Sequence, residues 1–136
     1  MNKDEQNEVG VDLDGTLSES CESDTYFPDQ IGAPIPDMVL RVKRHIELGD
    51  VVVILTARVH PGNGEQAEIA REAIQQWCFN VFGRVFEITC MKSHKMYRIY
   101  DDRAITVERN TGKIRTLDFE EPCLVYPDSI GILLDN

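Results

Sequence analysis

The sequence predicts an α/β fold built around a mainly parallel β-sheet. Segments with strand character alternate along the chain with segments of helical periodicity, which is the order typical of this class. The run "VVVILTAR" is apolar and largely β-branched up to its polar end, as in strands buried on both faces of a parallel sheet. Acidic and hydroxyl side chains follow several of the predicted strands directly. Ligands of parallel sheets bind beyond the carboxyl ends of the strands, so these residues are candidates for a functional site.

The composition is that of a soluble globular protein, and it argues against some partners. The chain has 136 residues, of which 42% are hydrophobic and 28% charged, so we expect a single domain over residues 1–136. No apolar run approaches the ~20 residues that a membrane span requires. The acidic opening "MNKDEQNE" resembles no targeting signal, and scattered cysteines favour free thiols in the cytoplasm. A net charge of −10 argues against binding to long nucleic acid.

The first predicted element is a buried strand that includes residues 9–11 and leads directly into two carboxylates. Asp12 and Asp14 stand two positions apart, and Gly15 and Thr16 follow them in a predicted tight turn. Two negative charges at a strand end disfavour folding unless a positive charge lies between them. This stretch is therefore the first candidate site in the chain.

A long connection follows this turn. Residues 18–36 contain three prolines and several acidic side chains, so they cannot form a regular helix. Connections of this length are usually lids or binding loops, and we expect a flap or lid here. Its aromatic residues Tyr26 and Phe27 either stack on a ligand or pin the loop to the core.

The next segments alternate between helix and strand. The pattern predicts a helix over residues 37–49, with Asp37 as its N-cap and Gly49 as its stop. Its buried face is expected to carry Val39, Val42 and Ile46. The strand of "VVVILTAR" follows and runs into Thr56, Ala57 and Arg58. A second helix is predicted over residues 65–83, with a buried stripe that consists of Ala70, Ala73, Ile74, Trp77 and Val81.

The last third of the chain carries two more predicted strands and a turn. The strands cover residues 84–90 and 97–102, and the second ends at Asp101 and Asp102. Residues 104–117 alternate around Asn-Thr-Gly and predict a β-hairpin. The tail, residues 118–136, is expected to be either a final strand or a packed irregular segment.

Polar and charged side chains are expected at the carboxyl ends of the predicted strands. Four aspartates, one threonine and one lysine are expected there, namely Asp12, Asp14, Asp101, Asp102, Thr56 and Lys92. A hard divalent cation would relieve this excess of negative charge, and Mg²⁺ is commonly held by carboxylates together with a substrate phosphate. Lys92, the Thr56 hydroxyl and the backbone N–H groups of the turn of Asp14, Gly15 and Thr16 would bind the remaining phosphate oxygens. One aspartate can act as a nucleophile toward phosphorus, and the second can act as acid and base.

Four stretches of the sequence resemble the motifs of the haloacid dehalogenase-like superfamily. "VGVDLDGTL", "VVVILTAR", Lys92 and "RIYDDRA" occur in the order of that family and span about residues 7–108. The resemblance implies a Rossmann-like three-layer core and Mg²⁺-dependent phosphoryl transfer. It implies that Asp12 is the nucleophile and that Asp14 is the acid/base, with its backbone carbonyl also facing the metal.

The same resemblance implies roles for the other site residues. Thr56 and Lys92 would bind the phosphoryl group, and Asp101 and Asp102 would hold the metal ion. Lys95 is a second candidate for the lysine motif, and Arg58 either contacts substrate or forms a surface ion pair. Because members that hydrolyse phosphate esters carry the second aspartate, Asp14 favours a phosphatase over a dehalogenase.

The chain is similar in particular to short phage and bacterial members and to the phosphatase domain of polynucleotide kinases. It has no room for a cap domain, so an open site is expected, which a second subunit of a homo-oligomer would be able to close. We expect a Mg²⁺-dependent phosphatase for a phosphomonoester, either a nucleotide or a terminal phosphate of a nucleic acid. The alternatives are phosphotransfer to an acceptor other than water and a non-catalytic binding or assembly module of the same fold.

Overall fold

The computed structural model describes residues 6–20 and 26–115 of the chain. The chain divides into two compact units, residues 1–102 and residues 103–136, where the sequence predicted a single domain. The candidate site residues up to Asp102 all belong to the first unit. We describe each unit by itself.

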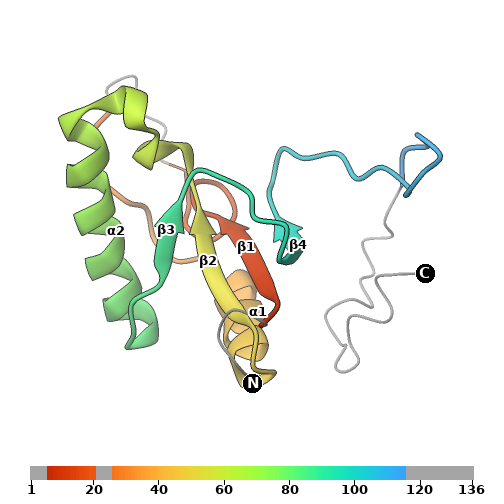
Figure 1. Ribbon diagram of the computed structural model, residues 1–136. Helices are drawn as coiled ribbons and strands as arrows, with labels where there is room; N and C mark the ends of the chain where they lie inside the picture. The colour runs from red at the N-terminus through yellow and green to blue at the C-terminus, as the bar shows by residue number, and fades with distance from the viewer. Residues whose placement is uncertain (1–5, 21–25, 116–136) are drawn as a thin grey trace. The chain divides into compact units, whose positions relative to one another are not determined.

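The first unit is built on a four-stranded, all-parallel sheet (Figure 1). Its order is β3-β2-β1-β4, and its strands are β1 (Glu8–Asp12), β2 (Val51–Leu55), β3 (Glu87–Thr89) and β4 (Met96–Tyr100). The α/β class with a parallel, Rossmann-like sheet is thereby confirmed. Since β1 lies between β2 and β4, the carboxyl ends of these three strands meet at one edge of the sheet.

Two helices cover one face of this sheet, α1 (Pro36–Glu47) and α2 (Glu65–Phe82). Alternate residues of the strands point into a single hydrophobic core that both helices share. This core includes Val9, Val11, Val52, Ile54 and Ile88 from the strands, Met38 and Val42 from α1, and Ala70, Ile74 and Cys78 from α2. Because the strand members of this core all point to the same side of the pleat, both helices pack on that side.

The start of α1 differs from the prediction. Pro36 occupies its first turn, and the N-cap residue is Ile35, which makes no side-chain capping bond. Asp37 is therefore not the N-cap, although its charge in the first turn is favourable for the helix dipole. Proline suits the first helical position because it has no N–H to leave unpaired, which explains why the helix begins there.

The buried face of α1 contains a histidine. Met38, Val42 and His45 are its buried residues, whereas Val39 and Ile46 are only partly buried at the edge of the core. A histidine with 6% exposure is stable there because both ring nitrogens have partners.

These partners tie α1 to β4. Nδ1 of His45 lies 2.8 Å from Oδ2 of Asp50, and Nε2 lies 2.9 Å from the Tyr100 hydroxyl. The Tyr97 hydroxyl also donates to Oδ2 of Asp50, at 2.7 Å. Because Tyr100 directly precedes Asp101, this network anchors the strand from which the last two site aspartates emerge.

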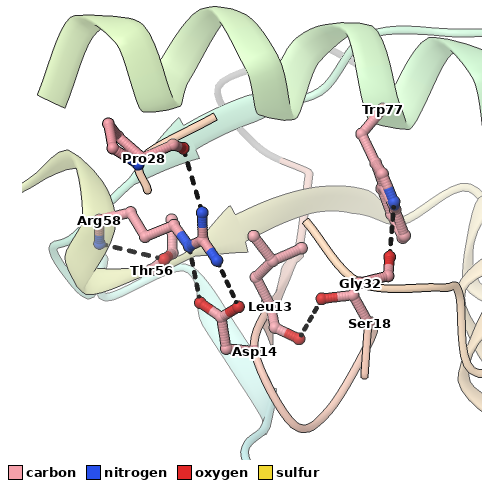
Figure 2. Close-up of polar contacts among 8 residues, drawn as sticks. All are labelled: Leu13, Asp14, Ser18, Pro28, Gly32, Thr56, Arg58 and Trp77. Atoms are coloured by element: carbon pink, nitrogen blue, oxygen red, sulfur yellow. Dashed lines mark hydrogen bonds and ion pairs between the residues drawn. The ribbon is translucent and has the colours of Figure 1, made fainter. Parts of the chain in front are cut away.

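The helix predicted at α2 is confirmed, and it also contacts Gly32 of the long connection between β1 and α1. Nε1 of the half-buried Trp77 donates to the Gly32 carbonyl at 3.0 Å (Figure 2). The buried positions of α2 are Ala67, Ala70, Ile74 and Cys78, and Ala73, Trp77 and Val81 lie partly buried beside them. The helix ends at Gly83, whose φ of 75° provides the left-handed C-cap.

The strand predicted over residues 84–90 is shorter in the structure, because only Glu87–Thr89 pairs with β2. In the second unit, the predicted hairpin is present as a short antiparallel turn. Glu108 N–H donates to the Lys113 carbonyl at 2.7 Å, and Arg115 N–H donates to the Thr106 carbonyl at 2.8 Å. Residues 116–117 of the predicted hairpin and the tail, residues 118–136, lie outside the described residues. Neither described helix is long and apolar enough to cross a membrane.

Candidate active site

The turn after β1 is organised around one backbone carbonyl. The carbonyl of the buried Leu13 accepts hydrogen bonds from the N–H groups of Thr16, Leu17 and Ser18, at 3.2, 3.0 and 2.9 Å. It also accepts from the Ser18 hydroxyl at 3.2 Å (Figure 2). These bonds fold the chain back sharply, so that Thr16 lies against the strand end at Asp12.

Three carboxylates converge at this edge of the sheet, which we call the carboxylate cluster: Asp12, Asp101 and Asp102. Asp12 ends β1, and the other two follow β4, whose Tyr100 is in register with Val11 of β1. One oxygen from each carboxylate lies within 4.8 Å of the others. The donor set consists of oxygen atoms only, which is the kind that Mg²⁺ and other hard cations prefer, so the residues fit such an ion.

The Thr16 hydroxyl links the two strands through this cluster. Its oxygen lies 3.2 Å from Oδ2 of Asp12 and 3.0 Å from Oδ1 of Asp102, and it accepts from the Asp102 N–H at 3.0 Å. Since a hydroxyl has a single proton, it donates to one carboxylate at a time. Thr16 thus positions the carboxylate cluster.

The surroundings of Asp12 shift the pKa of its carboxyl group. Its pKa is raised from 3.8 to about 7. The largest cause is burial, which disfavours the charged form, followed by a hydrogen bond with Asp102 and by the negative charge of Asp101. The Thr16 hydroxyl acts in the opposite direction. A cation among these oxygens would offset the repulsion that raises this pKa.

Gly15 allows the cluster to form. Its φ is +87°, a conformation that side chains rarely adopt, and a Cβ atom there would lie 2.6 Å from Oδ2 of Asp102. Two of the turn's N–H groups are bonded within the protein, because Gly15 N–H donates to the Ser18 carbonyl at 2.8 Å and Thr16 N–H to the Leu13 carbonyl. Gly15 and Thr16 shape and bridge the carboxylate cluster.

Asp14 lies apart from the carboxylate cluster and pairs with Arg58. The guanidinium donates from Nε to Oδ2 at 2.9 Å and from Nη2 to Oδ1 at 2.8 Å, as Figure 2 shows. The sequence left two interpretations of Arg58, a substrate contact or a surface ion pair. An ion pair is present, but it is buried, because only 9% of Arg58 is exposed. A charged pair with this geometry is among the stronger hydrogen-bonded contacts in proteins.

Arg58 also contacts the loop that was predicted to be a flap. Its Nη1 donates to the Pro28 carbonyl at 3.1 Å, and its guanidinium lies 5.6 Å from the ring centroid of Tyr26. Tyr26 and Phe27 are each about half-exposed. Tyr26 thus contacts the body of the protein through a cation–π interaction with Arg58, as in the second of its two predicted roles.

Thr56 and Ala57 follow β2 at the same edge of the sheet. Thr56 is 4% exposed, its N–H donates to the Thr89 carbonyl at 2.8 Å, and its hydroxyl accepts from Arg58 N–H at 3.1 Å. Thr56 thereby caps η2 (Ala57–Val59), a short 3₁₀ turn that carries the exposed Ala57 and the buried Arg58. The hydroxyl proton of Thr56 can still be donated to a ligand.

The two candidate lysines lie near opposite ends of the strands. The Lys95 carbonyl accepts from Glu8 N–H at 2.9 Å, which places the Lys95 backbone at the amino end of β1, away from Asp12. Lys92 is exposed and follows Thr89 of β3 by three residues, past the carboxyl edge. The backbone thus favours Lys92 over Lys95 as the lysine of the site.

Comparisons with known proteins add no functional information. No protein-family model and no curated protein matches the chain. Among solved structures, the chain is similar to a conserved protein from Bacteroides thetaiotaomicron, with 23% sequence identity and a TM-score of 0.45 over 82% of this chain and 83% of that one. A similarity at this level carries no argument about activity, so function is inferred from the site residues.

Proposed function

We propose that the protein is a Mg²⁺-dependent phosphatase that hydrolyses a phosphomonoester through an aspartyl-phosphate on Asp12. The observation that carries this proposal is the convergence of Asp12, Asp101 and Asp102 within 4.8 Å at the carboxyl edge of β1 and β4. The four-motif resemblance in the sequence supports the same conclusion.

The three members of the carboxylate cluster would hold the metal ion, with the backbone carbonyl of Asp14 as a further ligand. Mg²⁺ takes oxygen ligands and commonly keeps open positions for water and substrate phosphate. When bound, it would neutralise the charge of the carboxylates and of the phosphoryl oxygens. The Thr56 hydroxyl and Lys92 would contact the phosphoryl group, beside the exposed Ala57.

The reaction that we propose has two steps. An Asp12 oxygen attacks phosphorus, and the bond from phosphorus to the ester oxygen breaks with its electron pair on that oxygen. Asp14, in its protonated form, gives this oxygen a proton, so that the alcohol leaves and an acyl phosphate remains on Asp12. Asp14 then takes a proton from water, the water oxygen attacks phosphorus, and the bond to Asp12 breaks to release inorganic phosphate.

The substrate class that we propose is a phosphomonoester, either a nucleotide or a terminal phosphate of a short nucleic acid. The net charge of −10 disfavours long nucleic acid, because the summed field repels a phosphate backbone. A homo-oligomer in which a second subunit covers the carboxylate cluster would close the site over a small substrate.

Turnover of p-nitrophenyl phosphate tests this proposal. The wild type, Asp12→Asn and the control Asp37→Asn, which removes an exposed aspartate of α1, are compared with Mg²⁺ and with EDTA. We expect Mg²⁺-dependent turnover in the wild type and the control and its loss in Asp12→Asn. If Mg²⁺ binds but no variant hydrolyses the aryl phosphate or a phosphorylated oligonucleotide, the result favours a binding module. Phosphoryl transfer to an added alcohol instead of water would indicate a phosphotransferase.

A further inference from the structure

Arg58 is held in place from several sides, although it belongs to a short 3₁₀ turn. Its guanidinium contacts both oxygens of Asp14, the Pro28 carbonyl and the ring of Tyr26. Its backbone N–H is fixed on Thr56. A planar guanidinium whose stem is buried and whose N–H groups have several partners is pre-organised for the carboxylate of Asp14.

This arrangement determines what Asp14 can do. Both of its oxygens accept hydrogen bonds from Arg58, and its carboxylate lies outside the carboxylate cluster. An oxygen that accepts from a guanidinium cannot at the same time present a proton to a leaving group along that direction. Proton transfer from Asp14 therefore requires that at least one of the two bonds to Arg58 opens and that the freed oxygen takes up a proton from water.

We propose that Arg58 is a positioning residue that keeps Asp14 turned away from the reacting centre until the pair opens during turnover. This inference rests on the proposed function, because it assumes that Asp14 is the acid in the first step. The free energy of opening opposes the reaction only for esters whose leaving oxygen needs a proton. Arg58 therefore sets the selectivity between aryl and alkyl esters, since an alkoxide needs the proton and p-nitrophenolate does not.

A direct contact between Arg58 and the substrate phosphate is the competing explanation. Three N–H groups of the guanidinium already donate to Asp14 and Pro28, and only 9% of Arg58 is exposed, which leaves little of the group accessible to a phosphate. Such a contact would act on every phosphomonoester alike, because all of them present the same phosphoryl oxygens. The two explanations thus differ in how a change at Arg58 depends on the leaving group and on Asp14.

A double-mutant cycle with two substrates separates them. The ratio of kcat/KM for p-nitrophenyl phosphate over kcat/KM for glycerol 2-phosphate is measured for the wild type, Arg58→Lys, Asp14→Asn and the double variant. The ratio of kcat/KM values reports the steps up to formation of the acyl phosphate. A lysine cannot reproduce the forked contact, so we expect Arg58→Lys to lower the aryl-over-alkyl ratio roughly tenfold. In the Asp14→Asn background we expect the same substitution to leave the ratio unchanged.

An equal loss on both substrates in both backgrounds, or a ratio that Arg58→Lys does not change, overturns the inference while the phosphatase proposal stands. If the wild type hydrolyses neither these esters nor a phosphorylated oligonucleotide, the proposed function fails and the inference falls with it. Thermal unfolding verifies that each variant is folded. Arg58→Gln replaces Arg58→Lys if the latter does not fold, with the same expectation, because glutamine also lacks the fork.

Discussion

Replacing Asp12 by asparagine should make the metal-free protein more stable, although it removes the proposed nucleophile. At pH 8, above the pKa of about 7, Asp12 is mostly ionised and is repelled by its two neighbours in the carboxylate cluster. Asparagine has nearly the same shape and no charge, so the repulsion disappears while the packing at the end of β1 is kept. An amide N–H can also donate to Asp102, as the protonated acid does at lower pH.

The size of the effect follows from the geometry of the cluster. Two unit charges at 4.8 Å, the upper limit of the separations within the cluster, repel by about 0.9 kcal/mol at the dielectric constant of water. Asp101 and Asp102 are exposed, so the value for water is the appropriate one, and the two pairs together amount to about 2 kcal/mol. For a unit of this size, that corresponds to a rise in Tm of roughly 5–10 °C.

The contribution of Asp12 to stability decreases as the pH rises. Because the pKa of Asp12 is higher in the folded state, the folded protein retains a proton that the unfolded chain has lost. Stability due to this group therefore falls as the pH rises from 3.8 to about 7 and is level above that range. Asp12→Asn lacks this fall, so its advantage over the wild type should be present at pH 8 and absent at pH 4.

Thermal unfolding in EDTA at low ionic strength measures this difference directly, since salt screens exposed charges. Asp37→Asn is the matched control, because it also removes one aspartate charge but lies outside the carboxylate cluster. A Tm of Asp12→Asn at pH 8 that is equal to or below that of the wild type would show that the carboxylates do not repel one another as the geometry requires.

The remaining predictions concern the metal and the residues that shape the cluster. Mg²⁺ should raise the wild-type Tm more at pH 8 than at pH 5, because the ligands must be deprotonated to bind it, and differential scanning fluorimetry at both pH values checks this. Gly15→Ala should lower the free energy of unfolding by about 3 kcal/mol or more and abolish Mg²⁺ binding, because its Cβ would clash with Asp102. The control Gly49→Ala, at a φ of +91° with no atom within 4 Å of the added Cβ, should lower it by only about 1 kcal/mol. Urea unfolding measures the stability of both variants, and calorimetry measures their Mg²⁺ binding. Tyr100→Phe leaves Nε2 of the buried His45 without its partner and should cost about 1–3 kcal/mol, and an unchanged urea midpoint would contradict the role given to this bond.

Local patterns were sufficient to predict most of the fold. The apolar run of β2 and the helical periodicity of α2 are properties of neighbouring residues, and both elements occur close to where they were predicted. The start of α1 was predicted wrongly because aspartate is a frequent N-cap residue, which favoured Asp37. In the structure the helix begins one residue earlier, at Pro36. β3 was predicted too long because only Glu87–Thr89 pairs with β2, and no local pattern shows where that pairing begins.

In the candidate site, too, local sequence patterns predicted only part of the arrangement. The sequence predicted that Asp12, Asp14, Asp101 and Asp102 would meet, because the carboxyl ends of parallel strands share an edge. Three of these carboxylates do meet, whereas that of Asp14 pairs with Arg58 instead. It did not predict the partners of the polar groups, which lie far apart along the chain: Arg58 and Asp14 are 44 positions apart, and Thr16 and Asp102 are 86 apart. Such pairings depend on the three-dimensional turn around Leu13, not on local spacing.

The most direct test of the central claim is a search for phosphate on Asp12 itself. The wild type is mixed with p-nitrophenyl phosphate and Mg²⁺, quenched in acid during turnover, and digested for mass spectrometry. We predict one added phosphoryl group on the peptide that contains Asp12, and none in EDTA or in Asp12→Asn. Turnover in the wild type with no phosphoryl group on this peptide, or with the group on another residue, would contradict the proposed mechanism.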